Sequence, residues 1–206
     1  NVVTNAWHYA ALKQMEGIAG ALGKQDDVAF YASESDAFKK RFIRSFFDVR
    51  KGYFTDGLAA DTDHASLHGN MFPLAFDLVP AGKKQNVVDF IQTRGMACSV
   101  YGSQFLMDAL YEANDAEYAL HMLTKTDDRS WYNMIRVGST ISLEAWDNKY
   151  KPNQDWNHAW GAAPANIIPR RLMGVEPLTP GFGTASIKPQ LASLEWAEAT
   201  IPTIRR

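Results

Sequence analysis

The chain has 206 residues, of which 46% are hydrophobic, enough to fill a sizeable core in one large domain. Its net charge is −2, from 21 Lys and Arg against 23 Asp and Glu, and no basic run alternates with aromatic residues, so we expect no nucleic-acid partner. Polar residues interrupt every apolar stretch well before the roughly 20 residues of a membrane span, so we expect no membrane association either.

The amino-terminal part predicts two amphipathic helices. Apolar positions recur at three- and four-residue spacing from residue 5 to residue 22, and Gly23 follows as a natural helix terminator. A second helix carries an aromatic-rich stripe, and we expect its phenylalanines to lie in the core. The two stripes are Trp7, Ala11, Met15, Ile18 and Leu22, and then Val28, Tyr31, Phe38, Phe42 and Phe46.

The middle of the chain predicts further helices joined by short connections. Residues 49–62 lack periodicity and are expected to form a loop, and a third helix is expected to begin near residues 61–63, with a kink or break at Pro73. Three more helices are expected, one between Pro80 and Gly95, one around residues 105–110, and one from Asp115 to Leu123. This succession is typical of stacked helical hairpins without intervening strands, as in half or more of an α/α toroid.

The last part of the chain changes character. Residues 139–153 predict an extended loop, and residues 157–172 predict a final helix interrupted by Pro164. Alternating residues at 185–188 and 194–200 predict two strands. We therefore expect a mainly α fold, with a helical portion over residues 1–175 and the incomplete start of a β domain over residues 176–206.

The densest group of functional residue types lies at residues 140–147 and 155–161. Carboxylates, tryptophans and a histidine occur together there in loop-like sequence. Cleavage of a glycosidic bond needs one carboxyl group to protonate the leaving oxygen and another to activate water or attack carbon, while aromatic walls position the sugar. Glu144 is the best candidate for one of these carboxylates. As alternatives, it is a surface carboxylate or the partner of an arginine such as Arg136.

Other reactive residue types have simpler interpretations. Cys98 is the only cysteine and is flanked by small apolar residues, which favours packing between helices. His64 and His68 are four residues apart, the spacing of a two-histidine metal site, but nothing indicates a third ligand. We therefore expect neither a metal nor another cofactor.

Several motifs resemble those of a known family. They are the runs Gly138-Ser139-Thr140, Leu143-Glu144-Ala145-Trp146-Asp147 and Asn157-His158, with Ser130-Trp131 before them and Gly174-Val175-Glu176-Pro177, Pro180-Gly181-Phe182 and Ile187-Lys188-Pro189 after them. Together they resemble the end of the catalytic domain in bacterial α-L-rhamnosidases, and the similarity extends over nearly the whole chain.

The resemblance implies part of an (α/α)6 barrel followed by a small β-sandwich, in an enzyme that removes terminal α-L-rhamnose from glycosides or polysaccharides with inversion and without a metal. It assigns Glu144 as the general base and His158 as a sugar-binding residue, with Trp131 and Trp146 in the cleft wall. Trp160 and Asp147 are further candidates for substrate contact. Asp147 is equally suited to capping a turn or orienting the following lysine.

The general acid of that family is expected upstream of this sequence, in an amino-terminal part of the same protein that we expect to be missing here. The 206-residue chain alone should then be inactive and should leave an apolar face uncovered. The family is bacterial, and the sequence is compatible with a periplasmic or a cytoplasmic location. Two alternatives remain: another α/α-toroid glycosidase or lyase, and a helical module that binds carbohydrate without cleaving it.

Overall fold

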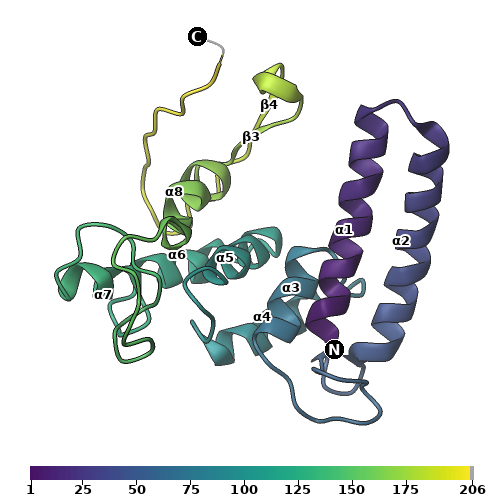
Figure 1. Cartoon of the computed structure of the whole chain (residues 1–206), viewed down its shortest axis with the longest axis horizontal. Helices are drawn as coiled ribbons and strands as arrows, with labels where there is room; N and C mark the ends of the chain where they lie inside the picture. Colours follow the sequence, from purple (N-terminus) through teal and green to yellow (C-terminus); the bar gives the residue numbers. More distant parts are fainter. Residues whose placement is uncertain (205–206) are drawn as a thin grey trace. The chain divides into compact units, whose positions relative to one another are not determined.

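The computed structural model describes residues 1–204, and its fold is mainly helical, as predicted (Figure 1). The chain divides into two compact units, Asn1–Arg94 and Gly95–Arg206. The predicted domain boundary after residue 175 lies inside the second unit, next to the first residue of a small sheet, and stays a prediction. Within the described residues, no helix has both the length and the apolar character of a membrane span.

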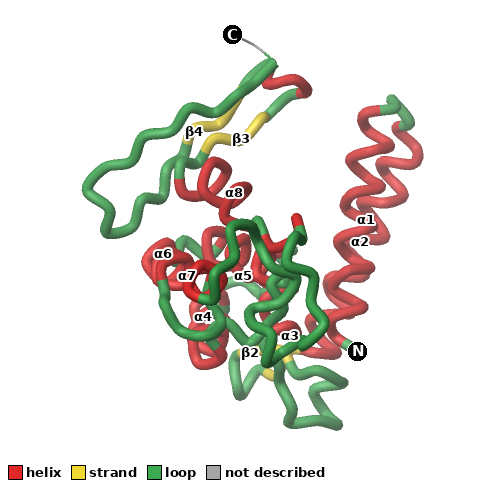
Figure 2. Tube along the Cα trace, turned by 60° about the vertical axis from the view of Figure 1, so that its left-hand side comes forward, coloured by secondary structure: helices red, strands yellow, loops and turns green. Residues whose placement is uncertain are grey.

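The first unit begins with a helical hairpin. Helix α1 (Val2–Ala21) and helix α2 (Gln25–Phe46) run side by side, as Figures 1 and 2 both show. The Asn1 side chain accepts a hydrogen bond from the Val3 N–H at 2.9 Å and caps α1. Gly23 adopts φ +71° just after the helix, the left-handed conformation that ends helices, as predicted.

Aromatic side chains form much of the core of this unit. Phe42 is 2% exposed and its ring centroid lies 5.4 Å from that of Phe54, while Phe46 is also buried. The prediction that the second stripe is core is thus confirmed for Phe42 and Phe46. Phe38, one turn earlier, is only partly buried and stacks against Phe42 at 6.5 Å.

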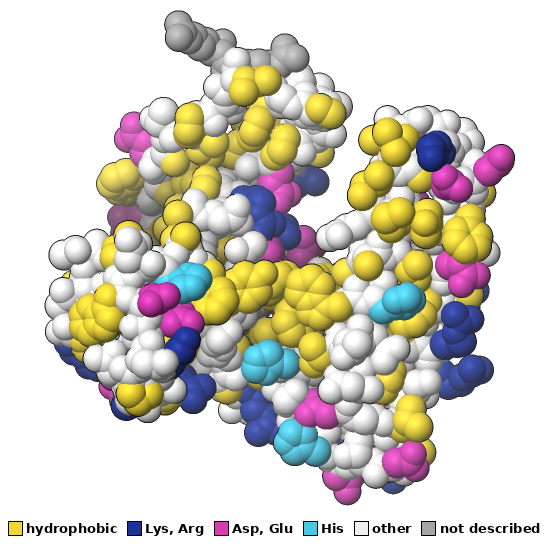
Figure 3. Space-filling view, viewed as in Figure 1, with side chains coloured by type: hydrophobic (Ala, Val, Ile, Leu, Met, Phe, Trp, Pro, Cys, Tyr) yellow, Lys and Arg dark blue, Asp and Glu magenta, His cyan; other side chains and the backbone are white. Residues whose placement is uncertain are grey.

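The apolar stripe predicted for the first helix lies on the exposed side of α1. Met15 is 41% exposed, Ile18 52% and Leu22 66%. The buried positions are Val2, Ala6, Tyr9, Ala10 and Ala19. Alanines lack bulk beyond Cβ and allow close helix packing, so the small-residue face meets α2 and α3 while the larger apolar side chains remain uncovered. Figure 3 shows the resulting exposed hydrophobic side chains over the α1–α2 hairpin.

A short hairpin corrects the expectation of a strand-free loop after α2. Strand β1 (Phe47–Asp48) pairs antiparallel with β2 (Tyr53–Phe54), with Phe47 opposite Phe54. The Asp48 carboxylate closes the turn by accepting hydrogen bonds from the Arg50 N–H at 2.9 Å and the Lys51 N–H at 3.2 Å. Strands of two residues are too short to produce an alternating sequence pattern, which is why the sequence did not reveal them.

The third helix begins later than predicted. Helix α3 (His68–Ala75) contains Pro73, so this proline does not end it. The residues before α3, which were expected to be helical, are bound by Asp56. Its carboxylate contacts the His64 ring at 2.6 Å and accepts a hydrogen bond from the Ser66 N–H at 3.0 Å. Helix α4 (Lys84–Arg94) follows as predicted, with Val87, Val88, Phe90 and Ile91 buried.

The second unit contains shorter helices. The expected helices are α5 (Ser103–Glu112) and α6 (Ala116–Thr124), and Asp115 caps α6 as predicted. Helix α7 (Trp131–Arg136) was not predicted, because its six residues are too few to show a periodic pattern. The expected final helix consists of three short pieces, a 3-10 turn (Ala159–Gly161), α8 (Ala163–Ile167) and a π-helical turn (Ile168–Leu172). Pro164 lies in the first turn of α8, so it begins that helix and does not interrupt it.

A small antiparallel sheet follows, in which β3 (Val175–Pro177) pairs with β4 (Ala185–Ile187). A 3-10 turn (Pro180–Phe182) lies between them. Strand β4 matches the first predicted strand. The second prediction, a strand over residues 194–200, is wrong, because that segment forms no strand pairing within the described residues.

Candidate active site

The candidate site lies on the loop segment over residues 139–158, drawn in green beside α7 in Figure 1. The two arms of this loop run antiparallel. The Glu144 N–H donates to the Asp155 carbonyl at 3.0 Å, and the His158 N–H donates to the Ser142 carbonyl at 2.9 Å. The Ser142 hydroxyl adds a hydrogen bond to the His158 carbonyl at 2.8 Å. This pairing brings Glu144 and His158 together from opposite arms of the loop.

The Glu144 carboxylate is held by two donors. Lys151 forms an ion pair with Oε1, and the Asp155 N–H donates to Oε2 at 3.0 Å. The Glu144 side chain is 12% exposed. The hydrogen bond from Lys151, followed by that from Asp155, lowers the pKa of Glu144 below its ordinary value, although desolvation acts in the opposite direction. Glu144 is therefore an ionised carboxylate near neutral pH.

The alternative partner considered for Glu144, Arg136, is not in contact with it. Arg136 pairs with Asp128 at 2.9 Å, on the α7 side of the loop. Lys151 takes the place of the expected arginine. Glu144 thus has a cationic partner, but one from its own loop.

An aromatic pair lies next to Glu144. The rings of His158 and Trp160 stack with centroids 4.1 Å apart and an interplanar angle of 20°. The Trp160 indole N–H donates to the Glu144 backbone carbonyl at 3.1 Å, while 42% of Trp160 is exposed. His158 Nδ1 is buried without a hydrogen-bond partner among the described residues. The arrangement places an imidazole and a partly exposed indole next to Glu144.

The other two tryptophans predicted for the site, Trp131 and Trp146, contact each other and bind backbone carbonyl groups. Trp131 and Trp146 meet edge to face, with centroids 5.2 Å apart. Trp146 is only 3% exposed, and its indole N–H donates to the Cys98 carbonyl at 2.8 Å. Trp131 donates to the Gly161 carbonyl at 2.8 Å and is partly exposed. Within the described residues Trp146 is therefore a core side chain, and its proposed place in a cleft wall stays a prediction.

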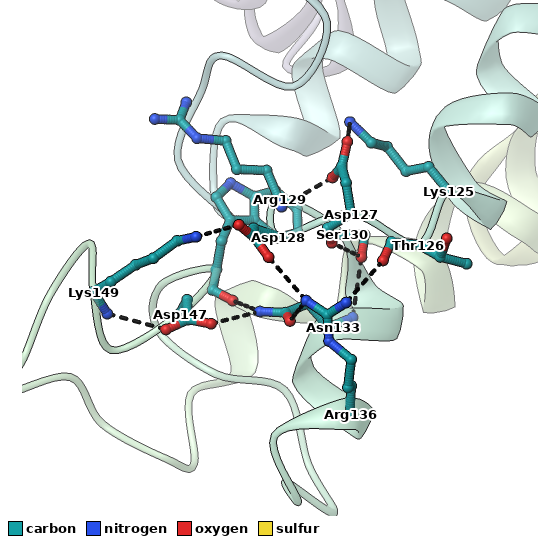
Figure 4. Close-up of polar contacts among 11 residues, drawn as sticks. Lys125, Thr126, Asp127, Asp128, Arg129, Ser130, Asn133, Arg136, Asp147 and Lys149 are labelled. Carbon is teal, nitrogen blue, oxygen red and sulfur yellow. Dashed lines mark hydrogen bonds and ion pairs between the residues drawn. The ribbon is translucent and has the colours of Figure 1, made fainter.

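Asp147 stabilises a turn at the base of the loop (Figure 4). One carboxylate oxygen accepts from the Asn133 side-chain amide at 2.9 Å, and the other accepts from the Lys149 N–H at 3.0 Å. These hydrogen bonds, the one from Asn133 foremost, lower the pKa of Asp147. The geometry agrees with the turn-capping interpretation, and a contact between Asp147 and substrate stays a prediction.

Sequence reasoning missed three residues that shape this site. Asn133 is fully buried on α7 and also donates to the Trp146 carbonyl at 2.9 Å. Gln154 is 7% exposed and accepts from the Ala145 N–H at 2.8 Å. Lys151 pairs with Glu144. No motif marks these positions. No sequence signal distinguished them either, because their roles depend on contacts that form only when the loop folds against α7.

The remaining reactive residues lie elsewhere. Cys98 is buried as predicted, and its burial raises the pKa of the thiol to about 12, so it has little nucleophilic character. His64 pairs with Asp56. Over the part of the chain that the structure describes, there is no group of three or more side chains suited to holding a metal ion.

Comparisons with known proteins agree on one family. The model described as the bacterial alpha-L-rhamnosidase 6 hairpin glycosidase domain matches residues 1–172. An alpha-L-rhamnosidase of Alteromonas sp. (strain LOR) is 28% identical over 223 aligned positions, which cover 98% of this chain and 23% of that protein. The chain thus spans about a quarter of the length of this relative.

Solved structures have the same fold. The α-L-rhamnosidase of Dictyoglumus thermophilum matches with a TM-score of 0.76 and 21% identity, over 89% of this chain and 21% of that one. The enzyme of Aspergillus terreus matches with a TM-score of 0.72 and 19% identity, over 89% and 22%. That of Streptomyces avermitilis, solved as a complex with L-rhamnose, matches with a TM-score of 0.72 and 21% identity, over 91% and 18%.

Proposed function

Because this chain belongs to the bacterial α-L-rhamnosidase six-hairpin glycosidase family, we propose that it carries the general base of an enzyme that hydrolyses terminal α-L-rhamnosides with inversion. The proposal concerns the natural protein that contains this chain, since the chain covers 23% of its relative from Alteromonas. The general acid is proposed to lie in a part of that protein outside these 206 residues.

The observation that carries the proposal is the state of Glu144. A general base must be unprotonated before it can take a proton from water, and the hydrogen bonds from Lys151 and Asp155 favour that form. An ionised carboxylate has about four lone-pair positions, and these two donors use two of them. The positions that remain can accept a hydrogen bond from a water molecule.

The proposed step is a single displacement. Water attacks the anomeric carbon while its proton moves to Glu144, and the bond from that carbon to the leaving oxygen breaks as the acid protonates the oxygen. Inverting glycosidases separate their two carboxyl groups by about 6.5–9.5 Å to admit the water. We expect the same separation between Glu144 and the acid in the complete protein.

His158 and Trp160 are proposed to bind the sugar. The exposed indole of Trp160 offers a flat surface for the C–H face of a pyranose ring, and the neighbouring imidazole can hydrogen-bond a hydroxyl group. The rhamnose assignment is supported by the family and by the Streptomyces avermitilis relative, whose structure holds L-rhamnose.

The decisive experiment is Glu144→Gln in the natural protein, assayed on an aryl α-L-rhamnoside. Loss of the base should reduce kcat by roughly 10²- to 10⁴-fold, because the amide cannot accept the proton. Glu117→Gln, at an exposed glutamate on α6, is the matched control and should retain turnover. Near-normal hydrolysis by Glu144→Gln would remove Glu144 from the mechanism.

Two further measurements separate the alternatives. NMR of the first-formed sugar should show the anomer opposite to the substrate, and retention of configuration would contradict the proposed displacement. Preferential turnover of an α-L-fucoside or a glucuronide would indicate another α/α-toroid enzyme. Sugar binding without cleavage of any of these substrates would indicate a binding module.

A further inference from the structure

Lys151 is placed to control the proposed base. Its ammonium group contacts Glu144 Oε1 from a position seven residues later in the same loop. We propose, on the basis of the function proposed above, that Lys151 is a positioning residue, which fixes the orientation of the Glu144 carboxylate and keeps it charged. Lys151 is not proposed to touch the substrate.

The loop that carries Lys151 is ordered by its own hydrogen bonds. The Tyr150 N–H donates to the Asp147 carbonyl at 3.0 Å, and the Gln154 N–H donates to the Lys151 carbonyl at 3.1 Å. The buried Gln154 side chain joins the two arms by accepting from the Ala145 N–H and donating to Asn148 Oδ1, each at 2.8 Å. The backbone of Lys151 is thus held within consecutive turns.

The base of this loop is attached to α7. Asn133 donates from its side-chain amide to both the Trp146 carbonyl and the Asp147 carboxylate, each at 2.9 Å (Figure 4). Lys149 also contacts Asp128, which binds Arg136, but both side chains of the Lys149–Asp128 pair are about half exposed, so this pair contributes little to holding the loop (Figure 4). Because the loop is tied to a helix at one end and to Glu144 at the other, the Lys151 ammonium is directed toward a defined carboxylate oxygen.

Hydrogen bonds to both oxygens fix the orientation of the Glu144 carboxylate. The terminal torsion of a glutamate is broad, so a carboxylate held through one oxygen can still rotate. With Lys151 on Oε1 and the Asp155 N–H on Oε2, the plane of the Glu144 carboxylate is defined. Its remaining lone pairs therefore point in fixed directions, as a general base requires.

The hydrogen-bond donors and positive charges next to Glu144 all lower its pKa. Lys151 makes the largest contribution to the lowered pKa of Glu144, the Asp155 N–H adds to it, and His158 contributes electrostatically with the same sign. Removal of the ammonium charge should therefore raise the pKa of Glu144. Since kcat/KM rises with pH as the base loses its proton, the acid limb of the pH profile should then move to higher pH.

Lys149 provides a matched control in the same loop. Its side chain is 49% exposed, against 41% for Lys151, but its partner is Asp128. Both lysine side chains are more than two-fifths exposed, so we expect that neither replacement unfolds the protein. The two lysines differ chiefly in whether they contact the proposed base.

The test uses Lys151→Met, Lys151→Arg and Lys149→Met in the natural protein, with kcat/KM for an aryl α-L-rhamnoside measured across the acid pH range. Lys151→Met should shift the acid limb to higher pH and reduce kcat on the order of 10- to 100-fold through misorientation. Lys151→Arg should restore much of the rate and the original limb. Lys149→Met should match the unchanged protein.

The outcomes distinguish this proposal from the proposed function. If Glu144→Gln abolishes turnover but Lys151→Met leaves both the acid limb and kcat unchanged, the role of Lys151 is rejected while that of Glu144 stands. If Glu144→Gln hydrolyses normally, the proposed function fails first. A ¹³C NMR titration of the Glu144 carboxyl carbon gives a readout independent of activity, and an unchanged midpoint in Lys151→Met would overturn the proposal.

Discussion

Asn133→Ala tests whether a single buried amide holds the active-site loop in place. Asn133 is fully buried, and its amide donates to the Asp147 carboxylate and to the Trp146 carbonyl. A hydrogen bond to a charged group contributes about 1.5–3 kcal/mol and a neutral one about 0.5–1.5 kcal/mol. The loop should therefore open more easily by roughly 2–4 kcal/mol.

Hydrogen–deuterium exchange of the natural protein measures this change directly. At about 1.4 kcal/mol per factor of ten, amides of residues 144–151 should exchange roughly 30- to 700-fold faster in Asn133→Ala. Asn153→Ala, at an exposed asparagine of the same loop, should change exchange little. Equal exchange rates in Asn133→Ala and the unchanged protein would refute the idea that α7 anchors the loop.

Three further predictions concern Gly161, Ile18 and Glu144. Gly161→Ala should destabilise the second unit and lower activity, because a Cβ there would lie 2.6 Å from the Leu143 carbonyl oxygen, and a thermal melt equal to that of the unchanged protein would contradict this. Ile18→Lys should reduce self-association of the isolated 206-residue chain, because it places a charge in the exposed apolar stripe of α1, and light scattering that detects equal association would count against it. The lowered pKa of Glu144 means that this group contributes stability above its unfolded-state pKa, and that the contribution is lost as pH falls through the folded-state pKa. Stability should therefore fall less steeply with acid in Glu144→Gln than in the unchanged protein, and parallel pH profiles in chemical denaturation would argue against that linkage.

Helix ends are features that nearby residue types predict well. Gly23 and Gly95 both adopt positive φ at helix ends, and Asp115 caps α6, as their residue types predicted. Helix α7 and the β1–β2 hairpin were not predicted, because they are too short to show a periodic sequence pattern. Local signals are thus reliable where an element is long enough to repeat them.

The burial of a side chain is harder to predict from the sequence, because it depends on which other elements pack against it. The stripe through Met15 and Ile18 has helical spacing, yet α1 packs through its alanine face. Trp146 belongs to a motif of the site but is buried. Its indole N–H donates a hydrogen bond to the backbone carbonyl of Cys98, which lies 48 residues earlier in the chain. A sequence pattern shows that a side chain is apolar, but it does not identify the surface that covers it.

The sequence by itself determined the helical fold class, several helix ends, and the cluster that contains Glu144 and His158, because residue type and spacing express these features directly. Only the tertiary structure decided that Lys151 is the partner of Glu144 in place of Arg136, and that Asn133 holds the loop. The physical reason is that an ion pair or a buried hydrogen bond depends on distance and direction in space, which arise only when the loop arms pair and the loop packs against α7.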